Sequence, residues 1–187
     1  MTHYPSLGPD DRLEELFRRF PRGVAPLITL HDQILRDEDS DLSLAERELI
    51  AAFVSGLNAC DFCFGAHKLM ARAFGVSETL IEDMVKDEQS ADLQPKLKPL
   101  FGFLRKLTLS PAKITGLDSK AVFDAGWSEE ALYDATLICA LFSFMNRVLD
   151  GAGIQPKPLF DNPSDADLKN RASGSYTEWA KNAALID

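Results

Sequence analysis

Residues 43–75, SLAERELIAAFVSGLNACDFCFGAHKLMARAFG, constrain the fold more than any other part of this chain, because they predict two consecutive helices. Ser43 followed by Glu46 is typical of a capping box, in which the hydroxyl accepts from an amide three residues on and the carboxylate reaches back. A helix is therefore expected to begin at about Leu44. Its buried face is predicted from apolar residues at helical spacing: Leu49, Ile50, Phe53, Val54 and Leu57.

Gly56 and Asn58 interrupt this pattern and predict the end of the first helix. Asn58 is a favourable N-cap for a second helix, which Gly75 is expected to terminate. On this interpretation Cys60 lies in the first turn of the second helix. Unpaired amides and the helix dipole favour negative charge there, so they favour a thiolate.

Two of the three cysteines and one of the three histidines fall between residues 60 and 67. Residues three apart on a helix are neighbours, so Cys60 and Cys63 are expected to approach closely enough to form a disulfide. His67 lies one turn beyond Cys63, where an imidazole can take a proton from the thiol and return it to a leaving group. The pattern thus supplies a nucleophile, a second thiol and a base.

The rest of the chain also has helical periodicity, and no strand alternation is found. Further helices are predicted over residues 10–20, 26–36, 78–85, 96–109, 118–125 and 129–149, with a short final helix around Trp179. The expected fold is all-α, a helical bundle forming a single domain over residues 1–187. Residues 155–187, rich in Pro, Asp, Asn and Ser, are expected to form a C-terminal tail or arm that wraps the surface or docks in an oligomer.

The helix at 129–149 is apolar on nearly every side, which predicts a central helix or one buried against another subunit. Cys139 within it is interpreted as a core residue. Asn146, Arg147 and Asp150 end this helix with a polar cluster, which suits a subunit contact, a capping network or part of a site wall. His31 is interpreted as an ordinary surface or satisfied residue, because spacing offers it no partner.

Composition excludes several classes of function. With 187 residues and 45% hydrophobic residues the chain suits one globular domain. A net charge of −9 without a basic run argues against binding nucleic acid or an anionic membrane. Residues 1–12 carry no leader pattern, and no apolar run is expected to reach membrane-spanning length. No Gly-rich phosphate loop indicates a nucleotide cofactor. The expected compartment is the cytoplasm, where a close dithiol stays reducible and is more plausibly catalytic than structural.

The chain resembles the alkyl hydroperoxidase D-like, peroxidase-related branch of the carboxymuconolactone decarboxylase superfamily. The matching pattern is Glu48, eleven residues, then Cys60-x-x-Cys63-x-x-x-His67. Segments 20–26, 144–147 and 150–151 also look like this branch, so the similarity spans about residues 10–155.

This resemblance implies a dithiol centre of Cys60 and Cys63 with a proton relay through Glu48 and His67. It implies a peroxidase that reduces a small hydroperoxide without a cofactor or metal and forms a homo-oligomer, trimeric or hexameric. Regeneration would need an external dithiol reductant of lipoyl, thioredoxin-like or low-molecular-weight type. One departure is Phe62, because alkyl hydroperoxidase D has a second histidine between its cysteines.

Several alternatives stay open at the level of sequence. Cys60, Cys63 and His67 with Glu48 or water would give four zinc ligands, although no second ligand pair is visible. Two further alternatives are a lactone decarboxylase-like lyase with incidental cysteines and a non-catalytic binding or stress-response protein. The helix dipole favours Cys60 as the attacking thiol, whereas the adjacency of His67 favours Cys63, the residue preferred here.

Overall fold

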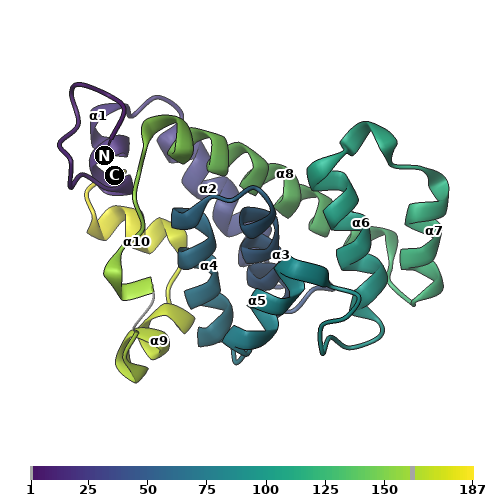
Figure 1. Cartoon of the computed structure of the whole chain (residues 1–187). Helices are drawn as coiled ribbons and strands as arrows, with labels where there is room; N and C mark the ends of the chain where they lie inside the picture. Colours follow the sequence, from purple (N-terminus) through teal and green to yellow (C-terminus); the bar gives the residue numbers. More distant parts are fainter. Residues whose placement is uncertain (1, 161–162) are drawn as a thin grey trace.

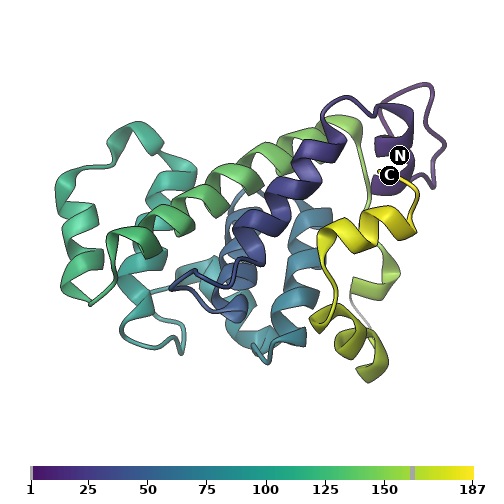
Figure 2. The same ribbon diagram turned by 180° about the vertical axis from the view of Figure 1, so that it is seen from behind.

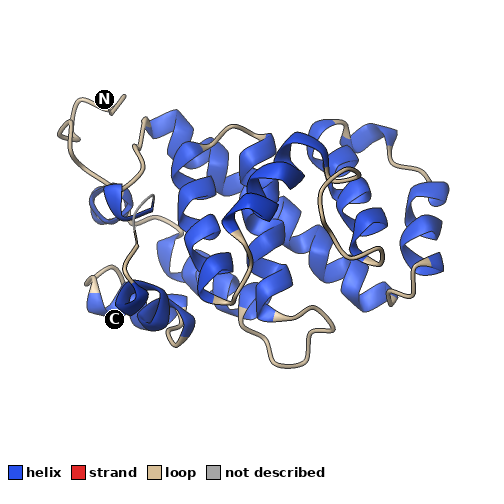
Figure 3. Cartoon of the chain, turned by 60° about the horizontal axis from the view of Figure 1, so that its bottom comes forward, coloured by secondary structure: helices blue, strands red, loops and turns tan. Residues whose placement is uncertain are grey.

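The computed structural model describes residues 2–160 and 163–187, which contain helices and no strand (Figure 3). The predicted all-α fold is confirmed. The α-helices are α1 (Leu13–Arg19), α2 (Val24–Leu35), α3 (Leu44–Leu57), α4 (Asp61–Ala73), α5 (Glu78–Asp87), α6 (Leu97–Leu109), α7 (Gly116–Asp124), α8 (Glu129–Ala152), α9 (Asp165–Ala172) and α10 (Tyr176–Asn182). Two 3₁₀ turns, η1 (Pro111–Lys113) and η2 (Pro158–Phe160), complete the described elements.

The centre of the bundle is α3, which contacts α2, α4, α5, α6 and α8 (Figure 1). Its start matches the sequence prediction: the Ser43 hydroxyl accepts from the Glu46 amide, and the Glu46 carboxylate accepts from the Ser43 amide. Every residue from Arg47 to Ser55 is buried, since other helices cover α3 on all sides. The phenyl rings of Phe53 and Phe101 pack edge to face at its junction with α6.

The longest helix, α8, crosses the back of the bundle beside α2 (Figure 2). It is long and apolar enough to cross a membrane, so the prediction that no segment approaches that length was wrong. Of its most apolar stretch, 50% is buried inside the bundle. Because α8 contacts α2, α3, α4, α6 and α7, it packs in the core of its own chain, which is the first of the two alternatives that the sequence predicted.

The C-terminal tail packs on its own chain rather than extending away from it. It contributes η2 and α9 against α4, and α10 against α2, and both chain termini lie at this end of the molecule (Figure 1). The sequence prediction missed α9, which begins with a capping box of Ser164 and Asp167. The short length of α9 and its lack of a repeating apolar face hid it from the periodicity test.

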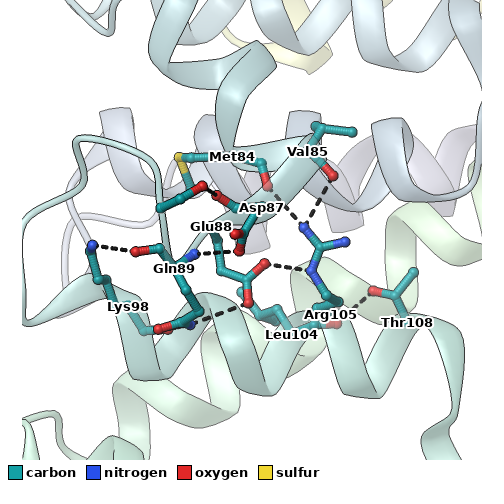
Figure 4. Close-up of polar contacts among 10 residues, drawn as sticks. Met84, Val85, Asp87, Glu88, Gln89, Lys98, Leu104, Arg105 and Thr108 are labelled. Atoms are coloured by element: carbon teal, nitrogen blue, oxygen red, sulfur yellow. Dashed lines mark hydrogen bonds and ion pairs between the residues drawn. The ribbon is translucent and has the colours of Figure 1, made fainter.

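The connection from α5 to α6 is fixed by Arg105, as Figure 4 shows. Its guanidinium donates to the carbonyls of Met84 at 2.9 Å and Val85 at 3.1 Å near the C-terminus of α5. It also pairs with the buried carboxylate of Glu88. A cation at the negative end of a helix is favourable, so this cluster has a structural role and lies outside the site described next.

Candidate dithiol site

The turn from α3 to α4 places both cysteines. Ala59 adopts the left-handed region at φ 56°, the amide of Ala59 donates to Gly56 O, and the amide of Cys60 donates to Ser55 O. These bonds form a Schellman motif, in which glycine is the usual left-handed residue. The second helix therefore begins two residues later than predicted: Cys60, not Asn58, is the N-cap of α4. The Asn58 amide instead donates to Asn146 at 2.9 Å.

Cys60 and Cys63 differ in their surroundings. Both are free thiols and both are buried. A hydrogen bond to the Cys63 sulfur, reinforced by burial, raises the pKa of Cys60. Cys63 lines a cavity of the protein beside His31 and His67, whereas Cys60 does not. The arrangement presents the Cys63 sulfur to a ligand and holds Cys60 behind it as a protonated thiol.

Glu48 is completely buried and joins three parts of the fold. Its Oε2 atom lies 2.7 Å from Nδ1 of His67, and its Oε1 atom lies 2.6 Å from a guanidinium nitrogen of Arg36. Burial alone would raise the pKa of Glu48, but the contacts with His67 and Arg36 outweigh it and leave this pKa below its usual value. An ionised Glu48 requires a proton on Nδ1 of His67, which leaves Nε2 as the atom that exchanges protons.

Tyr176, at the start of α10, is a member of the site that the sequence analysis did not identify. Its hydroxyl donates to Oε1 of Glu48 at 3.1 Å, and burial raises its pKa well above the usual value, so it stays a donor. The carboxylate of Asp32 accepts the amides of Tyr176 at 2.7 Å and Thr177 at 2.8 Å, which anchors α10 to α2. Arg36, at the end of the helix predicted over residues 26–36, was assigned no role from the sequence and pairs with Glu48.

The interpretation of His31 as a surface or satisfied residue without a partner was incomplete. Its side chain is buried and lines the same cavity as Cys63 and His67. Both imidazoles pack against the ring of Phe142, at centroid distances of 5.9 Å for His31 and 4.2 Å for His67. Helical spacing within α2 could not reveal this contact, because the partners lie on α4 and α8.

Burial lowers the pKa of His31 to about 4, which predicts an acid-sensitive fold. The unfolded chain binds a proton at this residue below about pH 6.5, whereas the folded chain does so only near pH 4. Stability contributed by neutral His31 is therefore complete above pH 6.5 and is lost as the pH falls towards 4, by about 3 kcal/mol in total. Urea denaturation at several pH values should show this loss, and His31→Phe should remove most of it. An unchanged pH dependence in that variant would contradict the assignment.

The cavity has a volume of about 370 Å³ and lies between α1, α2, α4, α8 and the C-terminal tail. Its apolar lining includes Leu13, Phe17, Ile28, Phe62, Ala66, Met70, Phe142, Met145, Leu149, Phe160 and Trp179. Phe62 packs edge to face against Phe160, at a centroid distance of 5.3 Å. A Cβ atom on Gly65 would lie 2.9 Å from the Phe160 ring, so this glycine permits the tail to close over α4. The result is an apolar pocket with Cys63, His31 and His67 in its wall.

The other polar candidates and the third cysteine lie outside the hydrogen-bonded group of Glu48, His67, Arg36 and Tyr176. The Asn146 amide donates to Ser55 at 3.0 Å and fixes α8 against α3, while Arg147 is exposed and bonds the Ser143 carbonyl of its own helix. Asp150 contributes a hydrogen bond that helps to raise the pKa of Cys60. Cys139 is buried beside the Thr108 hydroxyl at 3.4 Å, away from the dithiol.

Within residues 2–160 and 163–187, no group of three or more His, Cys, Asp or Glu side chains is arranged to hold a metal ion. Glu48 faces His67 and Arg36 rather than the sulfurs, so the ligand set that zinc would require is not assembled. The donor arrangement therefore favours proton transfer and thiol chemistry over a structural zinc centre.

A comparison with protein families finds a match over part of the chain. Residues 23–106 match the carboxymuconolactone decarboxylase family. The matched region contains Glu48, Cys60, Cys63 and His67, whereas Tyr176 lies outside it. A comparison of the sequence with curated proteins gives no match.

Several solved structures share the fold of this chain at low sequence identity. An uncharacterized peroxidase-related protein from Silicibacter sp. TM1040 is 23% identical, with 80% of this chain and 78% of that chain covered at a TM-score of 0.73. The alkylhydroperoxidase AhpD core of an uncharacterized peroxidase-related protein from Ralstonia eutropha JMP134 is 20% identical, with 86% and 94% covered at the same TM-score of 0.73. The debrominase Bmp8, solved as a Cys-to-Ala variant with 2,3,4-tribromopyrrole, is 18% identical, with 91% and 100% covered at a TM-score of 0.69.

Proposed function

We propose that the protein is a dithiol peroxidase that reduces organic hydroperoxides through Cys60 and Cys63. The observation that carries this proposal is the position of Cys63 and His67 in the wall of one apolar cavity, with the His67 ring held by the buried Glu48 carboxylate. A thiol, a base and an orienting carboxylate are the parts that an activated nucleophile needs. The match of residues 23–106 to the carboxymuconolactone decarboxylase family supports an enzymatic role, and the finer activity is our proposal.

In the first step Nε2 of His67 takes the proton of the Cys63 thiol, and the thiolate attacks the distal oxygen of the hydroperoxide. The oxygen–oxygen bond breaks, and Cys63 becomes a sulfenic acid. The leaving alkoxide takes the proton from His67 and departs as an alcohol. Glu48 stabilises the transient imidazolium and keeps the ring oriented.

In the second step Cys60 attacks the sulfenic sulfur and forms the Cys60–Cys63 disulfide. The proton of the Cys60 thiol and the sulfenic hydroxyl leave as water. The hydroperoxide is thereby reduced by two electrons and the dithiol is oxidised by two. An external dithiol then reduces the disulfide; the proposed reductant is a lipoyl group, a thioredoxin-like protein or a low-molecular-weight thiol.

Intact mass after thiol alkylation tests the proposed function. Reduced protein, freed of metal by a chelator, is treated with one equivalent of cumene hydroperoxide and then alkylated. The expected result is the loss of two alkylatable thiols, mapped to Cys60 and Cys63, while Cys139 remains alkylatable after unfolding. Free thiols at both positions together with unconsumed peroxide would reject the peroxidase.

A second candidate is reductive debromination by the same dithiol. The aromatic lining of the cavity favours it, since Phe62, Phe142, Phe160 and Trp179 suit a planar ring. Cys63 would take the bromine, the ring carbon would take a proton, and Cys60 would expel bromide as the disulfide closes. Release of bromide from 2,3,4-tribromopyrrole distinguishes this reaction from peroxide reduction. A lactone decarboxylase-like lyase is distinguished by activity that survives replacement of both cysteines by serine.

The assembly and the cellular compartment belong to the same proposal. We propose a cytoplasmic homo-oligomer, trimeric or hexameric. The α8 helix leaves Tyr133 at 63% and Phe144 at 53% exposed, which suits an additional contact. Light scattering of the purified protein tests the subunit number directly.

A further inference from the structure

His31 is the one imidazole of the cavity wall that the proposed mechanism does not use. It lies in the cavity with Cys63 and His67, and it packs against Phe142 and the Tyr176 ring, whose centroid is 5.2 Å away. Tyr176 in turn stacks on His67, at a centroid distance of 6.5 Å. The two imidazoles therefore share two aromatic neighbours and face the same space.

Its hydrogen bonding fixes the state of the His31 ring. Nδ1 lies 2.8 Å from the carbonyl oxygen of Leu27. A carbonyl accepts only, so Nδ1 carries the proton. Because burial keeps the ring neutral above about pH 4, Nε2 has a free lone pair. Within the described part of the chain, Nε2 has no hydrogen-bond partner. Only 5% of the surface of His31 is exposed.

We propose that Nε2 of His31 is the acceptor that binds the hydroperoxide O–H, while the apolar wall binds the organic body of the same molecule. The class of ligand that follows is a largely apolar molecule with one O–H donor at its reactive end. This deepens the proposed function, because accepting from the distal O–H orients that oxygen towards the Cys63 sulfur. Phe62, which lies between the two cysteines, supplies apolar surface on this wall, and His31 of α2 supplies an imidazole.

A second argument comes from the accessibility of this acceptor. Nε2 of His31 is not among the buried side-chain atoms that lack a partner, so its lone pair is open to the cavity that the residue lines. A leucine or phenylalanine at this position would offer the cavity no acceptor. The polar residues around it do not satisfy Nε2, since Glu48 is occupied by His67, Arg36 and Tyr176. A ligand hydroxyl donates to the lone pair of Nε2, so binding adds a hydrogen bond that the protein alone does not make.

The test uses a pair of ligands of nearly equal shape, 2-phenyl-2-propanol and tert-butylbenzene, in which a methyl group replaces the hydroxyl. Protein with ¹⁵N-labelled histidine gives signals from His3, His31 and His67 alone. The alcohol is expected to move the Nε2 signal of His31, whereas the hydrocarbon leaves it nearly unchanged. The alcohol should also bind roughly 10-fold more tightly, which is the size of one net hydrogen bond. Equal affinities and no selective shift at Nε2 would overturn the proposal.

Two variants separate the acceptor from packing. His31→Phe keeps an aromatic ring but no acceptor, and is expected to abolish the 10-fold preference for the alcohol and to slow thiol oxidation by cumene hydroperoxide about 10-fold. His31→Gln keeps an acceptor at similar reach. This variant should retain most of the preference for the alcohol and most of the rate of thiol oxidation. Reduction of the preformed disulfide by dithiothreitol should be equal in all three proteins. If His31→Phe and His31→Gln lose the preference and the oxidation rate to the same extent, the role of His31 is structural and the proposal fails.

The ligand experiment does not depend on peroxidase activity. If the wild-type protein binds the alcohol through His31 but consumes no hydroperoxide, the proposed function fails and the His31 acceptor stands. If hydroperoxide is consumed at equal rates by wild type and His31→Phe, the His31 proposal fails and the proposed function stands.

Discussion

Replacing Cys63 by serine is expected to lower peroxide consumption by roughly 10³-fold or more, since the reaction then lacks its nucleophile. The reason lies in the geometry of the pair: Cys63 lines the cavity, whereas Cys60 lies behind it with a raised pKa. Stopped-flow measurement of peroxide loss with reduced protein in excess gives the rate without any external reductant. Cys139→Ser is the matched control, because that thiol is buried elsewhere, and it should react at the wild-type rate.

Cys60→Ser should behave differently from Cys63→Ser. Attack at Cys63 remains, but no thiol closes the disulfide, so a sulfenic acid accumulates on Cys63. Dimedone labelling followed by peptide mass spectrometry detects it after one turnover. A dimedone adduct on Cys60 in the Cys63→Ser variant, with none on Cys63 in the Cys60→Ser variant, would reverse the order of attack.

The positions of the two cysteines relative to the start of α4 show what can be predicted from the sequence and what requires the structure. The Cys-x-x-Cys spacing predicted a close pair, and the local pattern predicted the helices on either side. The pattern could not predict that the turn extends to Ala59 in a left-handed conformation, because that position usually takes glycine. A shift of two residues in the helix start, from Asn58 to Cys60, changes Cys60 from a first-turn residue into the N-cap.

Long-range contacts account for the residues that the sequence did not reveal. Three residues converge on Glu48 and the cavity: His31 from α2, Arg36 from the C-terminal end of α2, and Tyr176 from α10. Each looks ordinary in its own segment, since a basic residue in an acidic loop and a tyrosine in a polar tail carry no periodic signal. Only the packing of α10 against α2 brings them together, and that packing depends on the Asp32 anchor.

Glu48→Gln is expected to lower the free energy of unfolding by about 3–5 kcal/mol, because it removes one member of a buried ionic cluster and keeps nearly the same shape. The guanidinium of Arg36 is left buried without its carboxylate, and the ring of His67 loses its orienting partner. Thiol oxidation by hydroperoxide should slow by about 10²-fold, the typical contribution of a positioned acid or base. Urea denaturation and stopped-flow oxidation measure the two effects separately. Glu46→Gln on the same helix is the matched control, since glutamine also completes a capping box.

The pH dependence of this difference identifies the carboxylate as its source. The pKa of Glu48 in the folded protein lies below its usual value of 4.5, so its ionic stabilisation is complete above pH 4.5 and is lost as the pH falls through the folded pKa. The gap in stability between wild type and Glu48→Gln should therefore be constant from pH 7 to about pH 5 and narrow under more acidic conditions. Because the charge of Glu48 acts on the pKa of His31, the comparison is made in the His31→Phe background, where that titration is absent. A gap that stays constant down to pH 3 would mean that the loss comes from packing around the amide, and the ionised Glu48 of the proposed proton relay would then be wrong.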